Sequence, residues 1–346
     1  MKLTHTLLPF LFGLGLLPQH GQAQEKVLNL YSARHYQTDE ALYSNFTKQT
    51  GIKINRIEAG DEPLLERLRN EGKNSPADVL MLVDAARLWR AQIDGLFAPI
   101  KSKTLESRVP DYLRGKDDGK GSEWFAVSTR ARVLVYNKAK FKASDVANYQ
   151  DLANPLLKGA VCTRSAFHPY MLSFIGAMAE HLGPVPAENW AKGVVSNFAR
   201  PPRGGDTDQI KAVASGECGV ALTNTYYLVR LMRSDKADDK ELIAKIGVVM
   251  PNQQSFGTHI NISGAGVLTH AKNKANAIRF VEYLLSDTAQ SLLAEGNNEW
   301  PVVSSVKINN PALDSLGPFK RDSLSIAQIG RSQIEAAKIS DRVGWR

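Results

Sequence analysis

The sequence lacks the short motifs that mark the common enzyme classes. It contains no nucleophile elbow of the form G-x-S-x-G, no H-E-x-x-H zinc motif, no phosphate-binding G-x-x-x-x-G-K-S/T loop and no C-x-x-C pair. Internal repeats and low-complexity segments are also missing. These absences favour a binding protein over an enzyme.

Long hydrophobic runs are missing as well. The apolar run Leu7–Leu17 is too short to span a bilayer, and no later segment has eighteen apolar residues in a row. Small residues at Gly21 and Ala23 predict a signal peptide over residues 1–23, cut after Ala23. No cysteine lies near this cleavage site, so we expect no lipid anchor and a soluble protein in a Gram-negative periplasm.

Cysteine is scarce, and no stretch is densely basic. Cys162 and Cys218 are the two cysteines. In an oxidising compartment they either form a disulfide, which would stabilise the fold by about 4 kcal/mol in the loop-entropy model, or remain two buried thiols. The formal net charge is +8, but lysines and arginines are scattered among acids. This pattern predicts no nucleic-acid binding, and it suits attraction of an anion or an anionic chelate.

The first part of the chain alternates strands and helices. The expected order is strand Val27–Tyr31, helix Asp39–Lys48, strand Ile52–Ile57, helix Glu62–Glu71, strand Ala77–Val83 and helix Ala85–Ile93. Such βαβ units place ligands at the carboxyl ends of their strands, where Arg34, His35 and Tyr36 follow the first strand. Asp84 follows the third strand, as a ligand-facing group or as the N-cap of the next helix.

The segment Trp124–Tyr136 is expected to be a strand. Arg130 and Arg132 alternate with apolar residues there, so both side chains should face the same way. A buried arginine needs an anionic partner. The alternative is that both arginines are solvated on an outer face.

Two tyrosine-bearing segments lie further along the chain. Tyr170 stands at the start of an expected helix, and Tyr226 and Tyr227 follow the strand Val220–Leu222. Near a strand-to-helix turn both phenols of the pair can point at one spot, whereas deep in a helix they would diverge by about 100°. The alternative is that the pair consists of core or rim aromatics. Between these segments, Gly204 to Asp206 are expected to form a turn before a helix that starts at Thr207.

The donor atoms on these segments suit a small, highly charged ion. They are the phenols of Tyr36, Tyr170, Tyr226 and Tyr227, with the imidazole of His35 beside them. Ionising one ordinary tyrosine at pH 7 costs about 4 kcal/mol, which only a strongly charged cation helped by arginine would offset. Thiolate and carboxylate-rich patterns typical of copper, zinc clusters or calcium are missing, and ferric ion fits the set.

Five runs of sequence carry a wider pattern: Tyr31–Asp39, Pro76–Leu80, Gly204–Gln209, Asn224–Tyr227 and Gly257–Gly266. Together they resemble the periplasmic ferric-ion-binding proteins of ABC-type iron importers, over essentially the whole mature chain. The resemblance implies an α/β, type II periplasmic-binding-protein fold with two α/β lobes joined by crossing strands around an interlobe ligand cleft. We expect the first lobe to comprise residues 24–128 plus 253–305, and the second 129–252 plus 306–346.

The resemblance also implies roles for individual residues. Tyr226 and Tyr227 match the paired tyrosinate ligands of the family, Tyr170 matches the third tyrosine of its tyrosine-rich branch, and His35 and Tyr36 match the pair from which that branch takes one or both first-lobe ligands. Arg132 and Arg34 resemble arginines that hold a synergistic anion such as carbonate or balance the tyrosinates. Another branch of the family takes a glutamate ligand from its first lobe. This chain does not match that branch, because the corresponding strand end carries Asp84.

The expected function is therefore capture of Fe(III) by a monomer that delivers it to an inner-membrane ABC permease, with hinge motion near Ser128 and Asn252. One alternative is a carrier of another solute, an organic anion or a polyamine, that uses Arg34, Arg130 and Arg132 without ionised tyrosines. A secreted hydrolase or redox enzyme on the same scaffold is the alternative from a different class.

Overall fold

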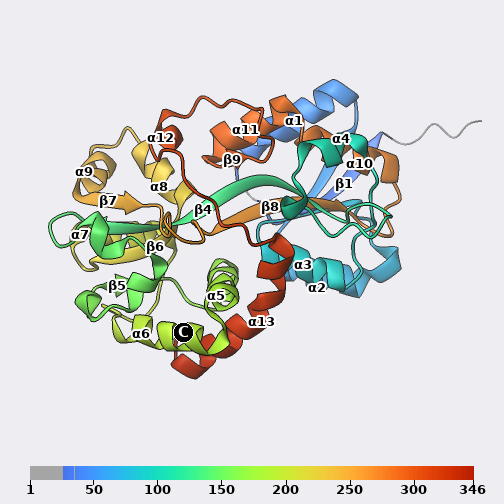
Figure 1. Ribbon diagram of the computed structural model, residues 1–346. Helices are drawn as coiled ribbons and strands as arrows, with labels where there is room; N and C mark the ends of the chain where they lie inside the picture. Colours follow the sequence, from blue (N-terminus) through green and yellow to red (C-terminus); the bar gives the residue numbers. More distant parts are fainter. Residues whose placement is uncertain (1–25, 35) are drawn as a thin grey trace, which may run out of the picture.

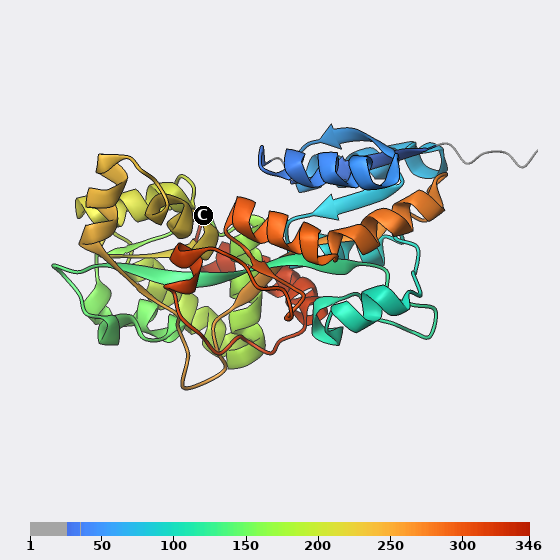
Figure 2. The ribbon, with the colours of Figure 1, turned by 90° about the horizontal axis from the view of Figure 1, so that it is seen from above.

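The computed structural model describes residues 26–34 and 36–346. The expected signal peptide, residues 1–23, and the candidate ligand His35 lie outside the described residues. Two α/β lobes lie side by side and are connected by the strands β4 (Phe125–Asn137) and β8 (Ile260–Val267) (Figures 1 and 2). Within the described ranges, every helix is too short or too polar to cross a membrane.

The first lobe is built on a mixed sheet with the order β2-β1-β3-β8-β4. β1 pairs in parallel with β2 and β3, whereas β8 runs antiparallel to β3 and β4. β3 is a buried apolar run, as expected for a central strand covered by helices on both faces. The elements of this lobe are β1 (Val27–Ser32), α1 (Asp39–Thr50), β2 (Lys53–Glu58), α2 (Asp61–Glu71), β3 (Val79–Leu82), α3 (Ala85–Ile93), α4 (Lys103–Arg108), α10 (Lys274–Leu284), α11 (Asp287–Asn297) and β9 (Trp300–Pro301).

The second lobe is built on the far half of β4. There β4 pairs antiparallel with β6 and β7, and β6 pairs in parallel with β5. The elements are β5 (Val161–Cys162), α5 (Pro169–Leu182), α6 (Pro184–Ser196), α7 (Asp206–Ser215), β6 (Val220–Asn224), α8 (Thr225–Met232), α9 (Ala237–Lys245), β7 (Ile246–Val249) and α12 (Pro311–Asp314). Short 3₁₀ turns lie at Gly72–Asn74, Asp111–Leu113, Ala143–Val146, Tyr149–Ala153 and Pro155–Leu157. Cys162 and Cys218, which the sequence left either paired or free, form a buried disulfide between β5 and the start of β6.

Both lobes share β4 and the last helix, α13 (Ile326–Val343). Residues 125–131 of β4 pair with β8, with a register shift between Ala126 and Ser128, and residues 132–136 pair with β6. α13 starts against α3 and ends near α6 (Figure 1). Its Ile326 and Ile329 pack into the core of the first lobe, and Ala336 and Ile339 pack into that of the second. The lobes are thus joined along one continuous strand and one continuous helix.

Candidate functional site

Four tyrosines from three segments meet where the lobes face each other. Tyr36 lies in the loop between β1 and α1 of the first lobe. Tyr170 is the second residue of α5, whose first residue is proline, a residue suited to a helix start. Tyr226 and Tyr227 are the second and third residues of α8, which begins two residues earlier than the sequence suggested. The second lobe therefore presents its phenols from the first turns of two helices.

The phenol groups lie close together. The hydroxyl of Tyr226 donates to that of Tyr170 over 3.4 Å. The ring centroid of Tyr226 lies 4.1 Å from that of Tyr227 and 6.3 Å from that of Tyr36. The contact between Tyr36 and Tyr226 crosses from one lobe to the other. The structure thus brings together the four tyrosines that the sequence singled out, at a spacing from which their oxygens can converge on one ion.

Burial makes these phenols reluctant to ionise while no cation is present. Tyr226 is 1% exposed and Tyr170 7% exposed. Burial raises the pKa of both well above the ordinary value of 10.0, neighbouring phenols raise it further, and Arg130 lowers it. Burial also raises the pKa of Tyr36, with Glu299 raising it further and Arg34 lowering it. A cluster with this electrostatic character is neutral at pH 7 and requires a strong cation to become anionic.

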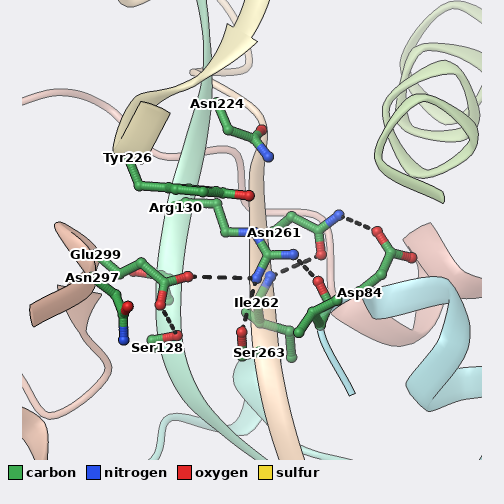
Figure 3. Close-up of polar contacts among 12 residues, drawn as sticks. Asp84, Ser128, Arg130, Asn224, Tyr226, Asn261, Ile262, Ser263, Asn297 and Glu299 are labelled. Atoms are coloured by element: carbon green, nitrogen blue, oxygen red, sulfur yellow. Dashed lines mark hydrogen bonds and ion pairs between the residues drawn. The ribbon is translucent and has the colours of Figure 1, made fainter. Parts of the chain in front are cut away.

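Arg130 lies beside Tyr226 on the crossing strand β4 (Figure 3). Its guanidinium lies 5.2 Å from the ring centroid of Tyr170, donates to Ser263 Oγ over 3.2 Å and contacts the carbonyl of Val83. Glu299 Oε1 is 3.8 Å from Nη1, and Nε of Arg130 has no hydrogen-bond partner among the described residues. Its positive charge favours ionised phenolates next to it. The sequence named Arg130 only for the alternative of an organic anion.

Arg34 is fully paired within the first lobe. It forms ion pairs with Asp39 and Glu299, each at 3.0 Å, and its guanidinium lies 5.1 Å from the ring of Tyr36. Ser128, on the crossing strand, donates to Glu299 over 3.0 Å. Arg34 therefore holds the segment that carries Tyr36 against β4. A role for Arg34 in anion binding or charge balance stays a prediction.

Arg132 faces the second lobe and is paired there. Nη1 donates to Asp206 Oδ2 over 2.6 Å and to Asn224 Oδ1 over 3.1 Å, and Nη2 lies 3.1 Å from the sulfur of Met171. Arg130 and Arg132, expected to face the same way, are both 1% exposed, so neither is a solvated arginine on an outer face. The anion-binding role of Arg132 stays a prediction, and its observed partner is a carboxylate.

Asp84 serves as the N-cap of α3. One oxygen accepts from the backbone NH of Ala86 over 2.8 Å. The carboxylate also accepts from Ser173 Oγ, in α5 of the other lobe, at 2.9 and 3.0 Å and from Asn261 Nδ2 over 2.7 Å (Figure 3). Both oxygens are thus occupied by hydrogen bonds, and one of these contacts bridges the two lobes.

Two histidines have structural positions. His168 accepts from the backbone NH of Tyr170 over 3.2 Å, and its ring centroid lies 4.6 Å from that of Tyr170. His259 is 2% exposed at the start of β8, beside Phe174. Within the described residues, no group of three or more histidine, cysteine, aspartate or glutamate side chains is arranged to hold a metal ion.

Sequence reasoning missed the charged side chains behind the tyrosines. Glu299 pairs with Arg34 across 265 residues of sequence, and Asp206 pairs with both Arg132 and Arg164. The guanidinium of Arg164 lies 5.4 Å from the ring of Tyr170. The one available signal was the alternation of Arg130 and Arg132 with apolar residues, since a buried arginine needs an anionic partner.

Comparison with known proteins places the chain among binding proteins. A family model described as bacterial extracellular solute-binding protein matches residues 41–315. Iron uptake protein A1 of Synechocystis sp. (strain ATCC 27184 / PCC 6803 / Kazusa) is 47% identical over 326 residues, covering 94% of this chain and 89% of that protein. The Fe(3+)-binding periplasmic protein of Serratia marcescens is 28% identical over 309 residues, covering 88% of this chain and 87% of that protein.

Solved structures give the same relationship. A Trichodesmium protein (IdiA, FutA) in complex with iron and citrate ligands has a TM-score of 0.87 and 50% identity, covering 92% of this chain and 100% of that chain. A ferric binding protein from Campylobacter jejuni has a TM-score of 0.86 and 40% identity, covering 92% and 100%. The two-lobe fold is therefore shared with periplasmic binding proteins of this type.

Proposed function

Because the chain belongs to the family of bacterial extracellular solute-binding proteins, we propose that it binds ferric ion between its lobes and carries it through the periplasm. The observation that carries this proposal is the convergence of four phenols, with Tyr226 and Tyr170 oxygens 3.4 Å apart and Tyr36 reaching the same point from the other lobe. Phenolate oxygen is a hard donor that suits a small trivalent cation.

The proposed ligands are Tyr36, Tyr170, Tyr226 and Tyr227. Each of the first three must lose a proton from a pKa above 10.0, so its ionisation at pH 7 costs more than about 4 kcal/mol. A trivalent ion supplies the opposing charge, and Arg130 offsets the excess negative charge once several phenolates surround it. A divalent ion of the same size would offset less of the free energy needed to ionise the phenols.

Two parts of the coordination shell extend this proposal. His35, next to Tyr36 in sequence, remains a candidate ligand outside the described residues. An anion that completes the shell, such as carbonate or a hydroxycarboxylate like citrate, would be drawn by Arg130, whose Nε has no hydrogen-bond partner among the described residues. Arg132 and Arg34, each paired with buried carboxylates, stay candidates for anion binding or charge balance.

The physiological partner in this proposal is an inner-membrane ABC permease, which would receive the iron from the closed carrier. The protein acts by stoichiometric binding and release, not by turnover. Lobe closure would then trap the ion, and hinge motion about β4 near Ser128 and about the second crossing near Asn252 would release it. Asn252 has a left-handed backbone, with φ of 60°, consistent with a sharp change of chain direction there.

The test is a titration of the iron-stripped mature protein with a weakly chelated ferric salt. We expect a visible tyrosinate-to-iron charge-transfer band that saturates at one equivalent and fades on acidification. A folded protein that develops no such band would refute the proposal, and the arginines between the lobes would then be screened against organic anions.

A further inference from the structure

Asp206 is a buried carboxylate that the proposed ligand set does not use. It is the first residue of α7 and is 0% exposed. Aspartate is seldom fully buried unless it is paired, because desolvating a charge is costly. The sequence suggested only a turn at this position. Its partners therefore show what the buried charge holds in place.

Three groups from three separate segments bind this carboxylate. Oδ2 accepts from Arg132 Nη1 over 2.6 Å and from the backbone NH of Asn224 over 2.7 Å. Oδ1 accepts from Arg164 Nη1 over 3.2 Å. Arg132 lies on the crossing strand β4, Asn224 ends β6, and Arg164 lies in the loop between β5 and α5.

Each partner stands next to a tyrosine of the site. Asn224 is the N-cap residue of α8, so its position sets where Tyr226 and Tyr227 begin their helix. Arg164 places its guanidinium 5.4 Å from the ring centroid of Tyr170. Arg132 contacts Asn224 Oδ1 and the sulfur of Met171, the residue after Tyr170. One carboxylate thus ties the starts of both tyrosine-bearing helices to β4.

We propose that Asp206 is a positioning residue for the ferric site: it fixes the starts of α5 and α8 so that three phenols are aimed at one point before metal arrives. This inference rests on the ferric-binding function proposed above. Asp206 does not contact the cargo; it acts through Asn224, Arg132 and Arg164. Outer partners that orient metal ligands typically change metal affinity about 10- to 100-fold when they are replaced.

Asp206→Asn tests the inference, with Asp78→Asn as a matched control. Asp78 is also 0% exposed and accepts from the backbone NH groups of Asn29 and Asn273, each at 2.8 Å, within the first lobe and apart from the tyrosines. Each variant leaves an amide where a buried network needs a carboxylate, so both should lose stability. We measure the ferric dissociation rate to a competing chelator and the position of the charge-transfer band.

Asp206→Asn should release iron about tenfold faster or more and should shift the band, whereas Asp78→Asn should match the wild type in both. Equal rates and bands in the two variants would overturn the positioning role while leaving the ferric function intact. A wild-type protein without any band would instead overturn the ferric function itself.

Arg164→Lys keeps the test decisive if Asp206→Asn does not fold. This side chain is 13% exposed, and lysine keeps its charge but loses the planar fork that contacts Asp206 while lying over Tyr170. We expect faster iron release and a shifted band, both smaller than for Asp206→Asn. An unchanged rate and band in Arg164→Lys would overturn the inference.

Discussion

The two lobes contribute to the same site in different ways. The second lobe presents three tyrosines from the first turns of α5 and α8, where the helical backbone and the contacts of Asp206 fix their direction. The first lobe presents Tyr36 from the loop between β1 and α1, and this side chain is half-buried. We infer that the second lobe holds its ligands in place before metal arrives, and that the first lobe completes the shell when the lobes close.

The buried charges behind the tyrosines also differ. In the first lobe one arginine, Arg34, lies between two carboxylates, Asp39 and Glu299. In the second lobe one carboxylate, Asp206, lies between two arginines. The excess positive charge of the second lobe favours phenolates, and Glu299 raises the pKa of Tyr36 after burial has done so. Burial nonetheless raises the pKa of Tyr170 and Tyr226 well above 10.0, so the second-lobe arginines offset only part of the free energy needed to ionise these phenols.

Acidification should produce the largest effect on iron affinity. The pKa values of Tyr36, Tyr170 and Tyr226 are raised above 10.0, so each phenol is protonated at pH 7 in the iron-free protein and must release its proton to bind iron. Affinity then falls as pH falls, throughout the range below 10, by about tenfold per proton and pH unit. From pH 7 to pH 5, three protons correspond to about a 10⁶-fold loss.

Chelator competition at several pH values, with a chelator of known proton stoichiometry, measures this slope. Replacing Tyr36 by phenylalanine should lower the number of released protons by one. A slope below one proton per iron would show that the tyrosines do not ionise on binding, and the difference drawn between the lobes would lose its basis.

Single tyrosine replacements should show the next largest effect. If ferric binding resembles the ~10–16 kcal/mol of a four-ligand metal site, one fixed ligand contributes about 3–4 kcal/mol, or about 10²- to 10³-fold in affinity. Tyr226→Phe, which removes a phenol held on α8, should approach this loss with the fold intact. Tyr36→Phe should cost less, because the three phenols of the second lobe remain arranged. Equal losses in the two variants would contradict the proposed division of roles.

The sequence predicted local elements well because their signals are local. Helix α3 begins and ends where its apolar periodicity and the N-cap at Asp84 indicated, and α1 ends at Gly51 in the left-handed conformation. The family resemblance supplied the two-lobe fold. The strand-to-helix turn before Tyr226 was also readable, although α8 starts two residues earlier than predicted, at Thr225, whose hydroxyl accepts from the backbone NH of Ala131 in β4.

The charge pairing could not be read from the sequence. Alternation places Arg130 and Arg132 on one face of β4, yet one reaches the tyrosines and the other a carboxylate 74 residues away. Which acid meets which arginine depends on how the lobes pack, and many acids were available. The sequence therefore predicted the proposed ligands, whose chemistry is distinctive, and missed the charged residues that we propose position them.

A buried histidine of the second lobe should lower the free energy of unfolding by about 2 kcal/mol between pH 7 and pH 5, whereas a buried aspartate of the first lobe should act in the opposite direction. Burial, opposed by Asp322 and assisted by nearby Arg132, lowers the pKa of His259, packed against the second-lobe core, to about 4. Below pH 6.5 the unfolded chain takes up a proton that the folded protein refuses, so this stability is lost as pH falls from 6.5 to 4. In the first lobe, burial raises the pKa of Asp61 to about 6, so this group contributes stability as pH falls, opposite to His259.

Urea unfolding of iron-free protein at pH 7 and pH 5 measures the difference. His259→Leu removes two ring nitrogens that lack hydrogen-bond partners among the described residues, and it should weaken the loss of stability between these pH values by about 2 kcal/mol. The same pH dependence in wild type and variant would show that His259 is not held neutral in the folded protein.

The smallest effect should come from one hydrogen bond between the lobes that does not involve the phenols. Ser173 of α5 donates to Asp84 of the first lobe, and a hydrogen bond to a charged group contributes about 1.5 kcal/mol or somewhat more. Ser173→Ala should weaken closure by about 1 kcal/mol and speed iron release about fivefold, because Asp84 retains Ala86 and Asn261 as partners.

Ser340→Ala is the matched control, since Ser340 is equally buried but bonds only to the Ala336 carbonyl within α13. Small-angle X-ray scattering of the iron-free proteins should show a larger radius of gyration for Ser173→Ala alone. If both serine variants release iron at the wild-type rate, the bond between Ser173 and Asp84 does not contribute to closure. Closure would then depend on Tyr36 meeting the metal, and the first lobe would act through its ligand alone.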